Sequence, residues 1–224
     1  MATYRRQLPG TPGTRHYAGV HGDGLVVGFD LDMTLVDPRA GVVAAMAALE
    51  SELGAGIDAQ WAAANLGPPA EMVLARWLPP EAVQSAARRY RELFEDIGLD
   101  KTTAMPGAAN AIAAVRSAGG RVIVVTAKYE QHARASLEAV ELRADAVYGL
   151  RFAAGKADPL LTHGARVYVG DHTADVLAAR ASGAIAVTVA SGPASRSELV
   201  DAGADAVLET LHEFPAWLAE YLER

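Results

Sequence analysis

The sequence predicts an α/β protein with a Rossmann-like parallel sheet as its core and an α-helical cap domain inserted after the first strand. Short runs that are apolar throughout recur along the chain, and helical patterns separate most of them. Such strands are typical of parallel sheets covered by helices on both faces. The stretch between residues 37 and 103 contains no strand pattern. Polar residues follow several of the apolar runs, which places them at the edge of the sheet where ligands bind.

Five apolar runs and a weaker sixth are the predicted strands, at residues 25–30, 122–126, 145–148, 167–170, 184–189 and 205–208. The helices expected between them show apolar residues three or four positions apart, which is the spacing of one helix face. These are Ile112 and Val115, then Ala133, Leu137 and Val140, then Val176, Leu177 and Ala181.

The predicted cap is a helical module at residues 38–103. The pair Asp37-Pro38 is a good helix start, with Asp as the cap and Pro at the first helical position. The core then comprises residues 25–37 and 104–224, and residues 1–24 lack apolar periodicity and are expected to form a mobile tail. The apolar positions that repeat at helical spacing in the cap are Val42, Met46, Leu49 and Leu53, then Met72, Val73 and Trp77, then Val83, Ala87, Tyr90, Phe94 and Ile97.

Composition narrows the class of protein. The chain has 224 residues, 51% of them hydrophobic and 21% charged, which suits one globular core with a small insert. No apolar run approaches the roughly 20 residues that span a bilayer, and the N-terminal arginines precede no apolar stretch. The absence of cysteine excludes thiolate metal sites. A net charge of −7 argues against nucleic acid as the main partner. We expect a cytoplasmic protein without membrane contacts.

The junction after the first predicted strand reads FDLDMT and carries two carboxylates, Asp30 and Asp32. Where the strand ends, the backbone can turn both groups toward one point. Two like charges at that distance are stable mainly when a divalent cation or a proton lies between them. By itself the pattern is weak, because Asp is common in turns.

Further polar groups fall at later strand ends: Thr126, Lys156, Asp171 and Asp175. Each of them alone has a structural explanation, as a helix cap, a first-turn acid or a solvated loop lysine. Together they supply carboxylates suited to Mg²⁺, and a hydroxyl and an ammonium suited to phosphate. One of the two FDLDMT carboxylates could then attack phosphorus and the other transfer protons.

With these motifs the chain resembles capped phosphatases of the haloacid dehalogenase (HAD) superfamily, and in particular the phosphoglycolate phosphatase branch, from about Leu25 to the C-terminus. The resemblance implies a nucleophile at Asp30 and a general acid/base at Asp32. It also implies a phosphate site formed by Thr34, Thr126, Ala127 and Lys156. The GDxxxD motif corresponds to residues 170–175. The Mg²⁺ ligands expected from the resemblance are Asp30, Asp32 through its backbone carbonyl, Asp171 and Asp175.

The chain departs from this family at Met33, where Gly is most common, which affects substrate fit more than chemistry. Lys128 follows the second motif and could be a further cationic contact. The turn at Gly67-Pro68 resembles the cap loop that helps choose the substrate, although a plain turn between helices would look the same. The charged candidates for contact with an anionic substrate are Arg39, Arg76, Arg88 and Arg89.

The predicted function is Mg²⁺-dependent hydrolysis of small phosphomonoesters such as phosphoglycolate through an aspartyl-phosphate. A phosphomutase would use the same intermediate. A response-regulator receiver also places acids, Thr and Lys at strand ends, but receivers are shorter and lack the insert. A non-catalytic binding module is disfavoured by the intact Asp30 and Asp32. The sequence leaves the identity of the phosphorylated metabolite and the oligomeric state open.

Overall fold

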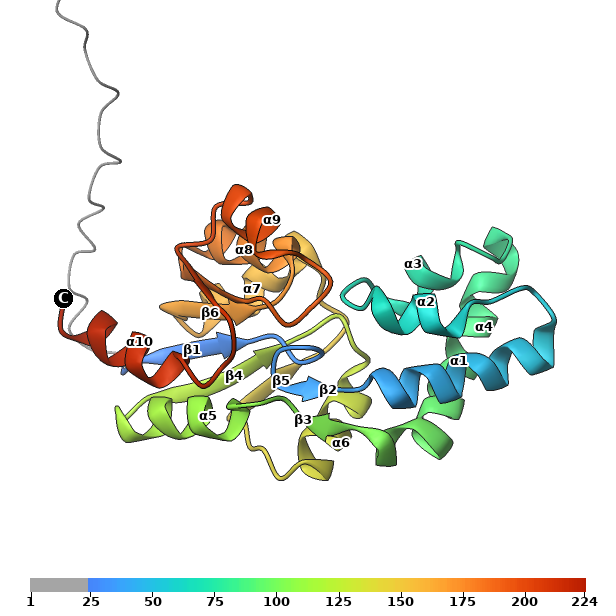
Figure 1. The fold of residues 1–224 in the computed structure, drawn as a ribbon, viewed down its shortest axis with the longest axis horizontal. Helices are drawn as coiled ribbons and strands as arrows, with labels where there is room; N and C mark the ends of the chain where they lie inside the picture. Colours follow the sequence, from blue (N-terminus) through green and yellow to red (C-terminus); the bar gives the residue numbers. More distant parts are fainter. Residues whose placement is uncertain (1–23) are drawn as a thin grey trace, which may run out of the picture.

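A computed structural model describes residues 24–224 (Figure 1). The predicted tail at residues 1–24 therefore lies outside the described residues, apart from Gly24. The core is a six-stranded sheet of order β5-β4-β1-β6-β7-β8 in which every pair of neighbours is parallel. This confirms the predicted fold class. The strands are β1 (Val26–Phe29), β4 (Arg121–Val125), β5 (Ala146–Tyr148), β6 (Val167–Gly170), β7 (Ile185–Val189) and β8 (Ala206–Leu208).

Helices cover both faces of this sheet, as its fully apolar strands require. Alternate residues of β1 point to opposite faces, so Val27 and Phe29 belong to one hydrophobic cluster and Val26 to the other. The first face is covered by α5 (Ala108–Ser117), α6 (Glu130–Ala139) and α10 (Phe214–Leu222), and the second by α7 (Ala157–Thr162), α8 (Thr173–Ser182) and α9 (Arg196–Asp201) (Figure 1).

In α8 the buried face differs from the predicted one. Val176 is fully buried, but Leu177 is 56% exposed and Ala181 also faces solvent. Ala178 and Ala179 are buried in their place. Small side chains let this helix lie close to the sheet, and a pattern search that weights large apolar residues misses them.

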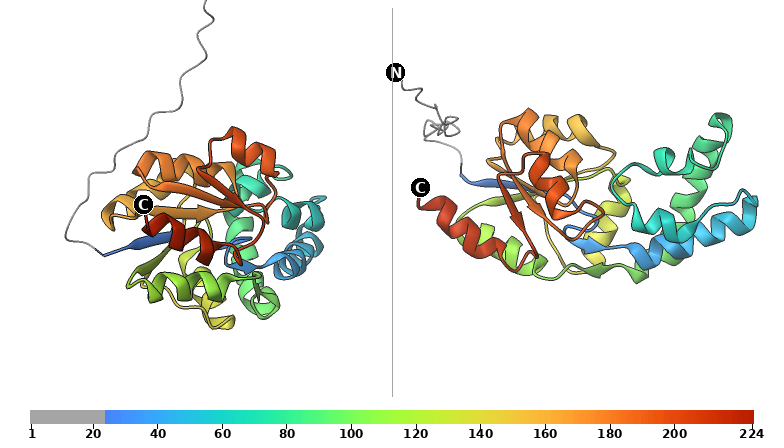
Figure 2. Two further views of the ribbon diagram at one scale, coloured as in Figure 1. Left: turned by 60° about the vertical axis from the view of Figure 1, so that its left-hand side comes forward. Right: turned by 45° about the horizontal axis from the view of Figure 1, so that its top comes forward.

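A separate helical unit follows β1, at the carboxyl edge of the sheet (Figure 2). It has its own hydrophobic cluster, which includes Leu49, Leu74 and Phe94. No residue of the sheet belongs to that cluster. The unit contains α1 (Arg39–Leu53), α2 (Ala59–Ala64), α3 (Ala70–Leu74), α4 (Pro80–Leu93), the π-helix η1 (Phe94–Gly98) and the 3₁₀ turn η2 (Leu99–Lys101).

Two short antiparallel strands that the sequence pattern did not predict join this unit to the core. They are β2 (Val36–Asp37) and β3 (Thr103–Ala104), paired Val36 to Ala104 and Asp37 to Thr103. The chain thus leaves and re-enters the core at one place. None of the helices in residues 24–224 combines the length and apolar character needed to cross a bilayer.

The start of α1 differs from the prediction by one residue. Pro38 occupies the cap position and α1 begins at Arg39. Asp37 still accepts a hydrogen bond from the Arg39 N–H, at 3.0 Å, and its carboxylate also pairs with the Arg39 guanidinium. Two of the predicted apolar repeats in this unit also extend one residue too far. Leu53, the last residue of the first repeat, is 47% exposed, and Ile97, the last residue of the third, is 38% exposed. Ile97 lies in the π-helix, whose wider turn rotates residues away from an α-helical face.

Candidate active site

Three buried carboxylates meet at the carboxyl edge of the sheet. Asp30 directly follows β1, Asp171 directly follows the neighbouring strand β6, and Asp175 lies in the first turn of α8. Each offers an oxygen atom that lies within 4.8 Å of the others. Because adjacent parallel strands end at the same edge, the pairing of β1 with β6 is what brings Asp30 and Asp171 together.

Lys156 reaches this cluster from the short 3₁₀ turn η3 (Ala153–Lys156). Its Nζ lies 2.7 Å from Asp175 Oδ1 and 3.0 Å from Asp30 Oδ1, and the side chain is only 3% exposed. Burial opposes the charge of this ammonium, but the Asp175 and Asp30 carboxylates outweigh it and raise the pKa of Lys156 above its ordinary value. The lysine is therefore a fixed positive charge beside Asp30.

The loop after β1 is held by two hydrogen bonds. The Thr34 hydroxyl donates to Asp171 Oδ1 at 2.8 Å, and the Ser191 hydroxyl donates to the Met33 carbonyl at 2.6 Å. Met33 has φ 62°, in the left-handed region, which explains why Gly is common at this position. Its buried side chain faces the hollow lined by Ala63 and Leu66 of the helical unit.

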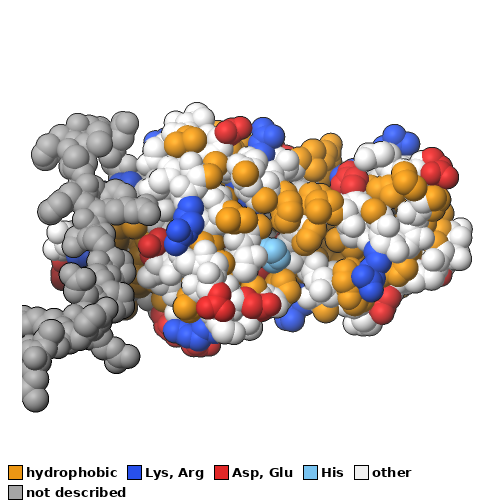
Figure 3. Space-filling model, turned by 90° about the horizontal axis from the view of Figure 1, so that it is seen from above, with side chains coloured by type: hydrophobic (Ala, Val, Ile, Leu, Met, Phe, Trp, Pro, Cys, Tyr) orange, Lys and Arg blue, Asp and Glu red, His pale blue; other side chains and the backbone are white. Residues whose placement is uncertain are grey.

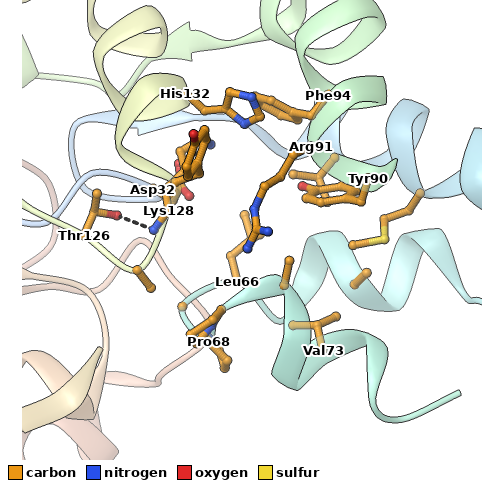
Figure 4. Close-up of a pocket in the computed structure, with 18 of the residues that line it drawn as sticks. Asp32, Leu66, Pro68, Val73, Tyr90, Arg91, Phe94, Thr126, Lys128 and His132 are labelled. Atoms are coloured by element: carbon orange, nitrogen blue, oxygen red, sulfur yellow. Dashed lines mark hydrogen bonds and ion pairs between the residues drawn. The ribbon is translucent and has the colours of Figure 1, made fainter. Parts of the chain in front are cut away.

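Asp32 lines the same pocket as Asp30 but is not one of the three clustered carboxylates. Its Oδ1 accepts a hydrogen bond of 2.8 Å from Lys128 Nζ, and that ammonium lies 4.4 Å from the centre of the Phe94 ring. The backbone N–H of Lys128 donates a hydrogen bond to the Thr126 hydroxyl, at 3.2 Å (Figure 4). Lys128 therefore links the Asp32 loop, the end of β4 and the helical unit.

A small pocket opens beside Asp30 and Asp32, between the sheet edge and the helical unit (Figure 4). It leaves about 70 Å³ accessible to the centre of a water-sized sphere. The predicted residues Gly67, Pro68 and Ala127 line it. The other lining residues are Val42, Met46, Ala62, Leu66, Pro69, Ala70, Val73, Tyr90, Arg91, Phe94, Thr126, Lys128, Tyr129 and His132.

Arg76, predicted to contact the substrate, does not line this pocket. Its guanidinium lies 4.4 Å from the centre of the Trp61 ring, on the outside of the helical unit. Arg39 and Arg89 are engaged in ion pairs elsewhere, and Arg88 is exposed.

On the face shown in Figure 3, apolar side chains gather at the junction of the two units, where a separate hollow is lined by residues that include Pro68, Met72 and Pro193.

The pocket also contains aromatic and basic residues that the sequence did not predict as site residues: Tyr90, Arg91, Phe94, Tyr129 and His132. Tyr90 and Phe94 do fall in the predicted apolar repeat of the helical unit. Arg91 lies outside the predicted apolar repeat, where an arginine is expected to face solvent. The sequence pattern therefore gives no indication that its side chain lines the pocket.

The carboxylate cluster fits a hard cation such as Mg²⁺. Among the described residues it sets three buried carboxylates against the ammonium of Lys156, which lies 3.0 Å from Asp30 Oδ1. Burial raises the pKa of Asp30 to about 7 despite the charge of Lys156, with a further contribution from Asp175. Burial and the same like charges raise the pKa of Asp171 well above its ordinary value. A bound divalent cation would remove this repulsion.

The predicted metal ligands are not equivalent in this arrangement. Asp175 is engaged through Oδ1 by Lys156 and through Oδ2 by the His172 N–H, at 3.0 Å. The Asp32 carboxylate is engaged by Lys128 and is not part of the cluster. Asp30 and Asp171 therefore have the most free oxygen atoms, and Asp175 chiefly orients Lys156.

Comparisons with known proteins agree with this architecture. The model of the haloacid dehalogenase-like hydrolase family matches residues 27–192. The chain is 29% identical over 209 residues to the "Probable phosphatase IndB" of Dickeya dadantii, which covers 83% of this chain and 89% of that protein.

Solved structures share the fold at lower identity. A haloacid dehalogenase-like hydrolase from Streptococcus pneumoniae, SP0104, superposes with a TM-score of 0.74 at 23% identity and covers 89% of this chain and 98% of its own. A predicted phosphoglycolate phosphatase from Haemophilus somnus gives a TM-score of 0.76 at 16% identity, over 89% of this chain and 100% of that one.

A parallel sheet with acids at its carboxyl edge and a helical unit beside them defines an α/β protein with a ligand site at the strand ends. The match of the family model over most of the chain then fixes the family. The chain belongs to the haloacid dehalogenase-like hydrolases.

Proposed function

We propose that the protein is a Mg²⁺-dependent phosphatase that hydrolyses small phosphomonoesters through an aspartyl-phosphate on Asp30. The observation that carries this proposal is Asp30 itself, a buried carboxylate beside Asp171 whose Oδ1 lies 3.0 Å from the Lys156 ammonium. A carboxylate in such a position is suited to attack phosphorus. The name of the relative from Dickeya dadantii supports the same class of reaction.

In the first step, an oxygen of Asp30 attacks phosphorus and the bond from phosphorus to the alcohol oxygen breaks. Asp32 gives a proton to the departing oxygen. In the second step, Asp32 takes a proton from a water molecule, which attacks phosphorus and releases inorganic phosphate and the free Asp30 carboxylate. Positioned proton transfer of this kind typically contributes about 10²–10⁴-fold to the rate.

Other residues hold the phosphoryl group. Lys156 supplies a fixed positive charge to its oxygens, and Thr126, which also lines the pocket, supplies a hydroxyl. Thr34 orients Asp171 through its 2.8 Å hydrogen bond. Mg²⁺ bound by Asp30 and Asp171 would neutralise charge on the phosphoryl oxygens.

Replacing Asp30 with Asn tests the proposal. We expect phosphate release from small phosphomonoesters, measured with and without Mg²⁺, to fall to background, because an amide oxygen is not a competent nucleophile. The variant should melt at or above the temperature of the wild type, because it removes a charge from a buried cluster of like charges. Asp100→Asn, at a side chain 76% exposed, is the matched control. Full Mg²⁺-dependent turnover by Asp30→Asn would contradict the proposed mechanism.

A further inference from the structure

Each of the three basic side chains at this site is already paired with an acid of the protein. Lys156 lies 2.7 Å from Asp175, and Lys128 lies 2.8 Å from Asp32. Arg91 is paired with Glu71 at 2.5 Å. Among the described residues at the site, no lysine or arginine is therefore left to balance a second negative charge on a substrate.

The pair of Arg91 and Glu71 bears on the pocket walls that the helical unit contributes. Arg91 comes from the last turn of α4 and its guanidinium extends toward the middle of the pocket (Figure 4). Glu71, in the first turn of α3, does not line the pocket. The two side chains are 19% and 25% exposed, so water screens their charges only in part. Glu71 therefore neutralises the one cation that the helical unit directs into the pocket.

The other pocket walls that the helical unit contributes are uncharged. They include Val42, Met46 and Val73 together with the Phe94 ring. His132 also lines the pocket, and its burial, with the nearby charge of Lys128, lowers its pKa below the ordinary 6.5. It is therefore neutral at pH 7. A carboxylate placed among these groups would lose its hydration without gaining a free counter-charge.

We propose that the pocket selects phosphomonoesters whose alcohol half is neutral and partly apolar, and that Glu71 sets this preference by neutralising Arg91. The inference rests on the proposed phosphatase function and deepens it. The Arg91 guanidinium can still donate hydrogen bonds to the hydroxyl groups of a neutral alcohol, because only one of its nitrogens is bonded to Glu71. A substrate with a carboxylate in the same place would be disfavoured by Glu71 and by the acids at the sheet edge.

A matched pair of substrates measures the preference. 2-Hydroxyethyl phosphate and phosphoglycolate differ only in a hydroxymethyl group in place of a carboxylate. We expect the wild-type kcat/KM to favour the neutral ester by about tenfold or more, which corresponds to one unfavourable charge contact in a partly buried site. A wild-type ratio that favours phosphoglycolate would overturn the inference.

Two substitutions should move this ratio in opposite directions. Glu71→Gln frees the charge of Arg91 and should improve phosphoglycolate relative to the neutral ester by about tenfold. Arg91→Gln leaves Glu71 without its partner and should disfavour phosphoglycolate further. Glu92→Gln removes the same charge from an exposed ion pair on α4 and should leave the ratio at the wild-type value.

Hydrolysis of p-nitrophenyl phosphate separates this inference from the proposed function. Turnover of that ester by each variant shows that the chemistry is intact, and an unchanged substrate ratio in Glu71→Gln then contradicts the role of Glu71 alone. Absence of turnover in the wild-type protein on every ester, with Mg²⁺ present, contradicts the proposed function and the inference with it.

Discussion

Gly192 lies against the Asp171 carboxylate, and a Cβ atom at this position would overlap the carboxylate oxygen Oδ2. Gly192→Ala should therefore displace Asp171, which is one of the two acids with free oxygens. We expect the Mg²⁺ concentration for half-maximal turnover to rise by about 10–100-fold, the usual effect of disturbing the support of a metal ligand. Gly24→Ala is the control, because its Cβ would meet only a carbonyl at 3.8 Å. Unchanged Mg²⁺ dependence in Gly192→Ala would show that Asp171 does not bind the metal.

At the scale of single residues, the sequence predicted the acids and the lysine better than their surroundings. Asp30 and Asp171 were predictable because each follows an apolar strand, and parallel strands end at one edge. The turn of Asp32 toward Lys128 was not, because it depends on contacts 96 positions apart in the chain. The same holds for Arg91, whose direction is set by its pairing with Glu71 on another helix.

At the scale of elements, strand β2 carries an ion pair that should make stability depend on pH. The Arg39 hydrogen bonds lower the pKa of Asp37 below its ordinary value of 3.8. A lowered carboxyl pKa contributes stability that is present above pH 3.8 and is lost as the pH falls through the folded-state value.

Asp37→Asn removes this contribution, and the partly exposed pair makes it worth about 0.2–1 kcal/mol. Urea unfolding of the wild type and the variant should therefore differ at pH 7, and the difference should shrink as the pH falls below 3.8. A difference that stays constant from pH 7 to pH 3 would mean that the charge of Asp37 does not stabilise the fold.

The sequence predicted the elements that are long enough to show a recognisable apolar run or an apolar repeat at helical spacing. All six core strands are present; β5, β7 and β8 each begin one residue later than predicted, β1 is shorter by one residue at each end, and β6 has the predicted bounds. Strands β2 and β3 have two residues each, so neither can show an alternating pattern. The π-helix η1 was likewise unpredictable, because its sequence continues the apolar repeat of α4 while its backbone does not.

At the scale of the whole molecule, the hydrophobic cluster of the helical unit should respond to damage separately from the two clusters that flank the sheet. Leu49 is fully buried in the cluster of the helical unit, and Leu49→Ala should destabilise that unit by about 2–5 kcal/mol. We expect faster amide hydrogen exchange in α1 and α4, with protection retained in β4.

Leu53→Ala is a matched control on the same helix, because that side chain is 47% exposed and its loss should change stability by no more than about 0.5 kcal/mol. Equal loss of protection in β4 and α1 of the Leu49→Ala variant would show that the sheet and the helical unit unfold together.

The general architecture followed from the sequence because the parallel strands and the helical stretch have different periodicities. The individual contacts that join the helical unit to the strand ends did not, since they are long-range ones such as that of Lys128 with Phe94. The backbones of Gly41 and Gly98 touch where α1 meets the π-helix, and that close approach is also invisible in the periodicity.

The pairing of β2 with β3 makes the helical unit a single insertion whose two ends lie next to each other in the core. Its first and last residues leave the core side by side, at Asp37 and Thr103. A gene segment inserted, lengthened or exchanged between these points would leave the strand order and the carboxylate cluster in place and would change the pocket walls that the helical unit supplies. In this architecture, new specificities can arise by recombination at a single junction.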